Sequence, residues 1–226
     1  LPEMIAMKGC PQNSYHAFDV FEHTIRTVHH VEELTTQDQR DDLDPRPLTA
    51  PMDMPRQIRL KLSALLHDLG KPLNVQRTIG GRVRFTGHAF TGARMVGGLG
   101  ERLRFSRNEI EHAVKMVRFH LRPLFLFNAR QKNALTQRSI TRFFLKTHAV
   151  TADILLLSLA DMRAKQVSAY AADSGFELFI RELIHQYESV FRPSLETPAL
   201  ISGHDLVHSL QLTPSPLFKQ ILACTR

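Results

Sequence analysis

Apolar residues recur at intervals of three and four along most of the chain, which is the pattern of amphipathic helices. The spacing predicts helices over residues 20–34, 56–70, 88–100, 106–119, 136–147, 150–165 and 174–191. The second of these is expected to end at Gly70, with Pro72 just beyond it. Alternating residues around Gly80 and Gly81 predict one short β-hairpin within 75–87. The expected fold class is all-α, a helical bundle with one short β-hairpin.

Two segments break the helical pattern. Residues 35–55 are rich in proline and aspartate and are expected to form an exposed, mobile loop. Residues 192–226 contain turns marked by prolines and two short helical stretches. No internal repeat or low-complexity tract is present. We therefore expect one domain over residues 1–191 and a C-terminal helical tail over residues 192–226.

Composition limits the class of protein. The chain has 226 residues and a hydrophobic fraction of 43%, enough for a sizeable core. No apolar run reaches the ~18 residues of a membrane span, and the first residues do not resemble a signal peptide. The two cysteines, Cys10 and Cys224, form no metal-binding pair. We expect a cytoplasmic protein with no membrane partner.

The net charge and the histidine content indicate which kind of partner and which kind of site to look for. The net charge is +7 and the sequence pI is near 9.8. This balance favours an anionic partner such as a nucleotide or RNA, although an ordinary basic surface gives the same numbers. The twelve histidines, several of them in apolar segments, make a metal site worth seeking.

Six ionisable residues lie in or beside apolar helices. They are His23, His67, Asp68, His88, His120 and Asp161. A buried carboxylate without a partner costs several kcal/mol, so each aspartate requires a cation, a set of donors or a metal. In a bundle core these residues would supply four imidazoles and two carboxylates. Such ligands suit divalent first-row metals.

Each of these residues also has an ordinary structural interpretation. A single buried histidine is more often hydrogen-bonded in the core than bound to metal. Asp161 has Arg163 and Lys165 nearby as alternative partners, and His67 with Asp68 simply closes a helix in that view. A second His-Asp pair follows Ser-Gly at a helix start, where Asp205 is expected to cap the helix.

The order of the candidates resembles a known superfamily. The pattern H…HD…H…H…D, with "LLHDLGK" in its centre and "SLADMRAK" at its end, is similar to the HD superfamily of metal-dependent phosphohydrolases. The resemblance implies that the first metal is held by His23, His67, Asp68 and Asp161. It further implies that Asp68 bridges to a second metal, held with His88 and His120.

Longer segments narrow the resemblance. "MKGCPQNSYHAFDVFEHTIRTV", "GRVRFTGHAFTGARM", "LRFSRNEIEHAVKMVRFHLRP" and "SITRFFLKT" resemble the HD region of the bacterial tRNA nucleotidyltransferase and poly(A) polymerase family. The tail resembles the segment that follows this region. The Gly-Ser loop and paired aspartates of a nucleotidyltransferase head are not found, so addition of CCA is not expected of these residues.

The resemblance implies a phosphohydrolase or phosphodiesterase acting on nucleotide or RNA-end phosphoesters, such as 2′,3′-cyclic phosphates, through metal-activated water. The expected cofactors are two divalent ions, Mn, Fe, Co, Ni or Zn, with Mg as an alternative. Asp68 and Lys71 are the expected catalytic residues. Lys71, Arg94 and Arg122 are candidates for binding phosphate, or else part of a solvated basic face.

Two other functions fit the same residues. One is a non-catalytic helical module that positions RNA or tRNA within a nucleotidyltransferase-family protein. The other is a nucleotide-sensing domain that binds its ligand without turnover. Salt-sensitive tRNA binding without hydrolysis would favour the first of these.

Overall fold

The computed structural model describes residues 1–13, 15–36, 52–165, 174–196 and 201–224. The chain folds into two compact units, Leu1–Tyr187 and Glu188–Arg226. The described residues are mainly helical, and their strands are the two of one antiparallel hairpin. The predicted all-α class with one short β-hairpin is therefore confirmed. The loop predicted at 35–55 falls mostly outside the described residues.

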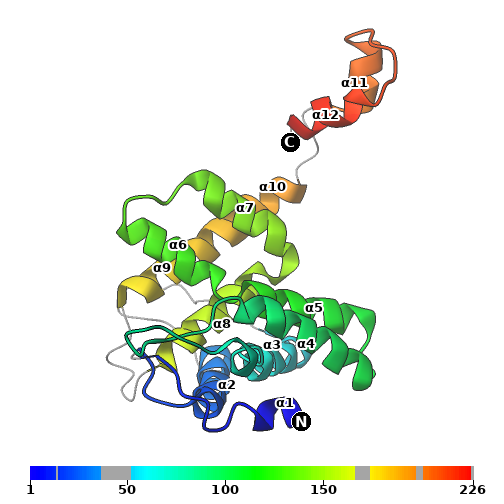
Figure 1. The fold of residues 1–226 in the computed structure, drawn as a ribbon. Helices are drawn as coiled ribbons and strands as arrows, with labels where there is room; N and C mark the ends of the chain where they lie inside the picture. Colours follow the sequence, from blue (N-terminus) through cyan, green and yellow to red (C-terminus); the bar gives the residue numbers. More distant parts are fainter. Residues whose placement is uncertain (14, 37–51, 166–173, 197–200, 225–226) are drawn as a thin grey trace. The chain divides into compact units, whose positions relative to one another are not determined.

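The first unit is a helical bundle. Its elements are α1 (Pro2–Ile5), α2 (Val20–Thr36), α3 (Met54–Leu66), η1 (Pro72–Asn74), β1 (Gln76–Arg77), β2 (Val83–Arg84), α4 (His88–Arg102), α5 (Arg107–Phe119), α6 (Arg122–Gln131), α7 (Gln137–Thr147), η2 (His148–Val150), α8 (Thr151–Arg163) and α9 (Ser174–Gln186). Helices α2 to α5 form one layer, and α6, α7 and α9 form another, with α8 between them (Figure 1).

Helix α8 is the centre of this unit. Every residue from Thr151 to Asp161 is buried, and the helix packs against α2, α3 and α9. The stretch Gln137–Arg163 is long and apolar enough to cross a membrane, but 72% of its most apolar window is buried within the protein. Such burial is typical of a core helix. The helix carries Asp161 into the middle of the bundle.

Helix α3 ends earlier than the sequence predicts. It stops at Leu66 instead of Gly70, and residues 67–71 form a tight turn in which the Lys71 amide donates to the Asp68 carbonyl at 2.9 Å. The turn passes very close to the start of α4. A Cβ atom built on Gly70 would lie 2.1 Å from the His88 carbonyl oxygen. Only glycine allows this approach.

Helix α6 was not predicted. Its sequence contains Pro123, which looks like a helix breaker, but the proline occupies the first turn of the helix. Proline is favoured there because its missing N–H would have no partner in any case. Pro123, Leu126 and Phe127 are buried, and the helix packs against α8 and α9.

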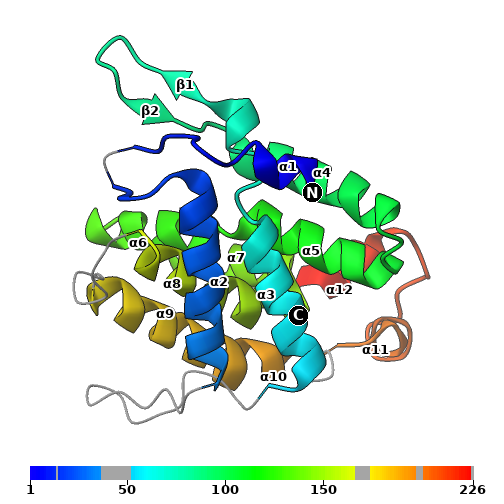
Figure 2. The ribbon, with the colours of Figure 1, turned by 90° about the horizontal axis from the view of Figure 1, so that it is seen from below.

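The hairpin stands at one edge of the first unit (Figure 2). Gln76 pairs with Arg84 and Arg77 with Val83, within the predicted range 75–87. After the second strand, Phe85 joins the buried core cluster that also contains Val83. The chain then enters α4 at His88, so the hairpin fixes where that helix begins.

The second unit is small. After a π-helical turn, Tyr187–Phe191, at the boundary between the units, it contains α10 (Arg192–Glu196), α11 (Gly203–His208) and α12 (Leu217–Cys224). Asp205 and Ser202 form a capping box at the start of α11, so the predicted capping role of Asp205 is confirmed. The functional division at residues 191 and 192 remains a prediction.

Candidate metal centre

All six predicted metal ligands meet inside the first unit. His23 comes from α2, His67 and Asp68 from the turn after α3, His88 from the first residue of α4, His120 from the end of α5 and Asp161 from α8. None of these residues is more than 7% exposed. We call these six residues the HD centre. They come from five separate segments of the chain, so the tertiary fold brings them together.

One side of the centre is built around Asp161 and one oxygen of Asp68. The His23 Nε2 atom lies 3.0 Å from Asp161 Oδ1 and 3.6 Å from Asp68 Oδ2. The His67 Nε2 atom lies 3.0 Å from Asp68 Oδ2 and 4.0 Å from Asp161 Oδ1. Two imidazoles and two carboxylates therefore face one another here.

The other side is built around the second oxygen of Asp68. Its Oδ1 atom lies 3.3 Å from His88 Nε2 and 3.8 Å from His120 Nε2. Asp68 thus turns one carboxylate oxygen to each side of the centre. This is the arrangement that a carboxylate bridging two ions requires.

The backbone fixes the orientation of the histidine rings. Three of them donate Nδ1–H to the main-chain carbonyl three residues earlier: His67 to Ala64, His88 to Phe85 and His120 to Val117, each at 2.7 Å. The His23 Nδ1 atom lies 3.4 Å from the Ala164 carbonyl oxygen. The Nε2 lone pairs are therefore left for the centre, as is usual for metal-binding histidines.

Several inward-facing atoms lack a hydrogen-bond partner. The Nε2 atoms of His23, His67 and His88 and the Oδ1 atom of Asp68 are buried in this way, whereas Asp68 Oδ2 forms an ion pair with the Lys71 ammonium group at 2.6 Å. The three Nε2 atoms lie 3.0–3.3 Å from the nearest carboxylate oxygens of Asp68 and Asp161. Unpartnered buried polar atoms are rare and need an explanation. Donors directed at a shared point fit a divalent cation, and imidazole with carboxylate is the donor set that such ions accept.

Comparison with known proteins agrees with this geometry. Residues 20–163 match the HD domain family. The chain belongs to the HD domain family. The matched segment begins at the first residue of α2 and ends with α8, so it contains all six residues of the HD centre.

The HD domain also has curated relatives among nucleotidyltransferases. The chain is 29% identical to a CC-adding tRNA nucleotidyltransferase of Thermus thermophilus and 27% identical to an A-adding tRNA nucleotidyltransferase of Deinococcus radiodurans. The alignments cover 96% and 98% of this chain but 42% and 45% of the relatives. A bifunctional uridylyltransferase/uridylyl-removing enzyme of Phenylobacterium zucineum is 29% identical over 80% of this chain and 18% of its own length. The chain thus spans less than half of the proteins it matches.

Both carboxylates of the HD centre are held in the ionised form. Burial alone would raise the pKa of Asp68, but His67 and Lys71 outweigh it and hold that pKa well below its usual value. Burial likewise opposes ionisation of Asp161, yet Lys165 and then His23 hold its pKa well below the usual value. The negative charges that a metal ion needs are therefore present.

The histidines are divided between two electrostatic environments. Burial, reinforced by the neighbouring His67, lowers the pKa of His120 to about 3. Burial also lowers the pKa of His23, although Asp161 opposes the shift. Burial alone would lower the pKa of His67, but Asp68, Asp161 and the Ala64 carbonyl together outweigh it and raise that pKa. His23 and His120 thus have the neutral imidazole that coordinates metal.

A pocket of about 530 Å³ opens onto the HD centre. Asp68, His88, His120 and Asp161 line it, together with Lys71. The Lys71 Nζ atom lies 2.6 Å from Asp68 Oδ2 and 2.6 Å from Gln12 Oε1. The predicted phosphate-binding lysine therefore lies between the centre and the pocket.

The other two candidates for phosphate binding lie elsewhere. Arg94 and Arg122 have exposed side chains and do not line the pocket. Of the alternative partners considered for Asp161, Lys165 lies 3.6 Å from its Oδ2 atom, whereas Arg163 pairs with Glu177. Lys165 also lines the pocket, so a second ammonium group is available beside the centre.

Sequence reasoning overlooked one residue of this site. His16 lines the pocket and packs edge-on against His23, with ring centroids 5.0 Å apart. It lies in the irregular segment before α2. No helical periodicity pointed to it, because that signal exists only within regular elements.

Proposed function

We propose that this HD domain is a metal-dependent phosphohydrolase acting on nucleotide or RNA-end phosphoesters, such as 2′,3′-cyclic phosphates. The observation that carries the proposal is the buried group of inward-facing imidazoles and carboxylates beside an open pocket. Two divalent transition-metal ions would be held, one by His23, His67, Asp68 and Asp161 and the other by Asp68, His88 and His120. The ligand atoms of His23, His67 and Asp68 lie within 4.8 Å of one another, as do those of Asp68, His88 and His120. Asp161 Oδ1 adjoins the first group, 3.0 Å from His23 Nε2.

Such ions, when bound, lower the pKa of water and neutralise the charge of a phosphoester. The protein supplies the surroundings for this chemistry. Asp68 offers one oxygen to each side of the centre, and the Lys71 ammonium group attracts the substrate phosphate. Tyr15 and Phe85 line the pocket and provide aromatic faces for a nucleoside. Arg94 and Arg122 would contact only a substrate that extends beyond the pocket.

The relatives support the class of substrate. Two of them are named as tRNA nucleotidyltransferases, which act on RNA. The third is named partly for removing uridylyl groups, which is cleavage at phosphorus. A nucleotide phosphoester is the substrate class that these names share, and the net charge of +7 suits it.

The test compares the two His-Asp pairs of the chain. Metal content is measured by elemental analysis on protein purified without chelator, alongside hydrolysis of 2′,3′-cyclic AMP and bis(p-nitrophenyl) phosphate. Asp68→Asn should abolish metal binding and turnover, whereas Asp205→Asn should change neither, because Asp205 caps α11. No metal and no turnover in the wild type after addition of Mn, Ni or Co would refute the proposal.

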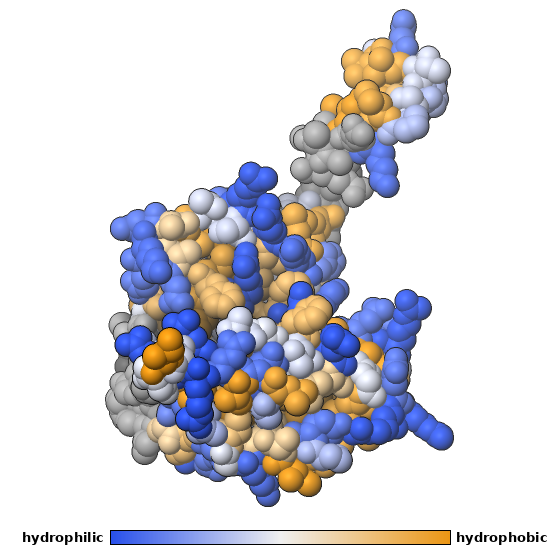
Figure 3. Space-filling view, viewed as in Figure 1, coloured by the Kyte–Doolittle hydropathy of each residue, from blue (hydrophilic) through white to orange (hydrophobic). Residues whose placement is uncertain are grey.

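One observation favours a second candidate, an RNA-positioning module. Residues 112–152 contain no aspartate or glutamate and eight basic residues: Lys115, Arg118, Arg122, Arg130, Lys132, Arg138, Arg142 and Lys146. All eight side chains are exposed. Hydrophilic side chains are visible over α6 and α7 in Figure 3. The eight positive charges of this stretch exceed the net charge of the whole chain, which is +7.

Salt dependence of tRNA binding tests the second candidate. Each phosphate contact that is lost reduces the slope of log affinity against log salt by about 0.7 to 0.9. Replacing Arg138, Arg142 and Lys146 on α7 by glutamine should therefore reduce the slope by about 2 if all three contact phosphate. An unchanged slope would exclude the exposed side of α7 as the RNA-binding surface.

A further inference from the structure

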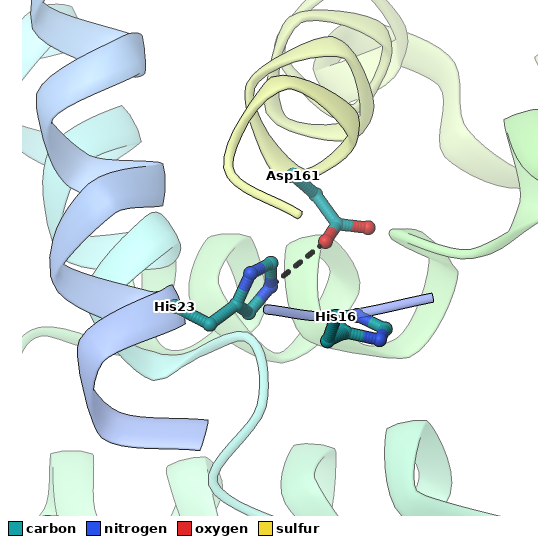
Figure 4. A group of neighbouring side chains, drawn as sticks. All are labelled: His16, His23 and Asp161. Carbon is teal, nitrogen blue, oxygen red and sulfur yellow. Dashed lines mark ion pairs between the residues drawn. The ribbon is translucent and has the colours of Figure 1, made fainter. Parts of the chain in front are cut away.

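His16 extends the HD centre beyond its six residues. Its ligand atom and those of His23 and Asp161 all lie within 4.8 Å of one another. Figure 4 shows the Asp161 carboxylate, from the distant α8, directed between the rings of His16 and His23. The three donors have the mutual spacing that a shared ion requires.

The ring of His16 is oriented like those of the other histidines. Its Nδ1 atom lies 2.8 Å from Asn13 Oδ1, so Nδ1–H donates to the amide oxygen. Its Nε2 atom is buried and has no hydrogen-bond partner among the described residues. The same division, with Nδ1 held by a neighbour and Nε2 left free, is seen at His67 and His88. His67 and His88 are both members of the HD centre.

The backbone also fixes His16 in place. Its amide donates to the Asn13 carbonyl at 3.0 Å, and the next amide, of Ala17, donates to the Lys165 carbonyl at 3.0 Å. Lys165 is the second residue after α8, the helix that carries Asp161. The segment before α2 is thus tied to the same end of the helix as the carboxylate that His16 faces.

We propose that His16 is a further imidazole ligand, binding through Nε2 the ion that His23 and Asp161 hold. The inference rests on the proposed metal centre and deepens it. With His67 and Asp68, the first ion would have five protein donors, whereas the second would keep three, from Asp68, His88 and His120. Five donors favour ions that accept five or six ligands over tetrahedral zinc. Water and the substrate phosphate would then bind mainly at the less saturated second ion.

Cobalt binding provides a test that does not depend on turnover. His16→Phe keeps an aromatic ring but removes the ligand, and His29→Phe is the matched control because His29 is 67% exposed on α2. Co²⁺ is titrated into each metal-free protein against a competing chelator, and its visible absorption is recorded. His16→Phe should weaken one of the two sites by about tenfold or more. Its absorption should also intensify, since Co²⁺ absorbs more strongly at lower coordination number.

A second variant guards against misfolding. His16→Ala should show the same loss, and free imidazole, admitted through the pocket, should restore the wild-type cobalt spectrum. The inference is overturned if wild type and both variants bind two ions with affinities within about twofold and with the same spectrum. A wild-type protein that binds no cobalt would overturn the proposed metal centre itself, a result distinct from failure of the His16 assignment alone.

Discussion

Gly70→Ala should separate the two sides of the HD centre. Gly70 lies in the turn that carries His67 and Asp68, and this turn lies against the first turn of α4. An added Cβ atom would lie 2.1 Å from the His88 carbonyl oxygen and 2.5 Å from the Gly92 nitrogen. Both neighbours are backbone atoms of a helix, so no side-chain rotation relieves the overlap.

The structure gives the size of the effect. Contacts of a Cβ atom below 3.0 Å are essentially never seen, so the turn and α4 must move apart by about 1 Å. Asp68 belongs to one of these segments and His88 to the other, and their facing atoms are now 3.3 Å apart. Overpacking of this kind costs about 1–3 kcal/mol and occasionally more. We expect a loss near 3 kcal/mol, because backbone packs against backbone.

The assay is urea unfolding of the metal-free protein, followed by measurement of metal stoichiometry. Gly98→Ala is the control, since Gly98 lies on the exposed side of the same α4 with nothing within 4 Å of its added Cβ. That change should stabilise the protein by about 0.5–1 kcal/mol. If Gly70→Ala unfolds at the wild-type urea concentration and still binds two ions, the close approach of the turn to α4 is not needed for the centre.

Two further predictions concern the buried charge of Asp153 and the number of metal ions bound. Asp153→Asn should destabilise the protein by about 2–3 kcal/mol at neutral pH, because Asp153 is a buried partner of Arg56 and His112. Burial opposes its ionisation, but His112 and Arg56 lower its pKa. Its contribution is therefore complete above the unfolded-state pKa and is lost as the pH falls through the lower folded value, so the variant should show a shallower acid limb in urea unfolding. Glu111→Gln, in an exposed pair, should change stability by less than about 0.5 kcal/mol, and an equal loss in both variants would contradict the argument. His120→Ala should reduce the metal content from two ions to one by elemental analysis, and retention of both ions would remove His120 from the proposed ligand set.

The sequence predicted most helices because their apolar faces repeat with helical spacing. The predictions from the sequence were wrong where backbone geometry, and not apolar periodicity, determines where a helix begins or ends. The end of α3 depends on a close contact between Gly70 and α4, two segments that are distant in sequence. Helix α6 depends on Pro123 beginning a helix, whereas the same residue inside a helix would break it.

In the candidate site, too, some residues could be predicted from the sequence and others could not. Asp68 and Asp161 could be selected from the sequence, because a carboxylate in an apolar helix needs an explanation. His16 could not, since its place depends on Asn13 and on the bond from Ala17 to Lys165. The candidate phosphate contacts rested on nearness in sequence to a motif, and this does not determine on which surface an arginine side chain lies.

The separation of the ligands along the chain has a consequence for folding kinetics. His23 and Asp161 lie 3.0 Å apart in space, yet the five helices α3 to α7 lie between them in the sequence. Such non-local contacts form late, because the entropy of closing the intervening loop is lost before the contact is gained. Asp68, His88 and His120 are all synthesised before α8 leaves the ribosome, so their side of the centre can assemble first. Uptake of the proposed ion at His23 would then report that α8 has docked.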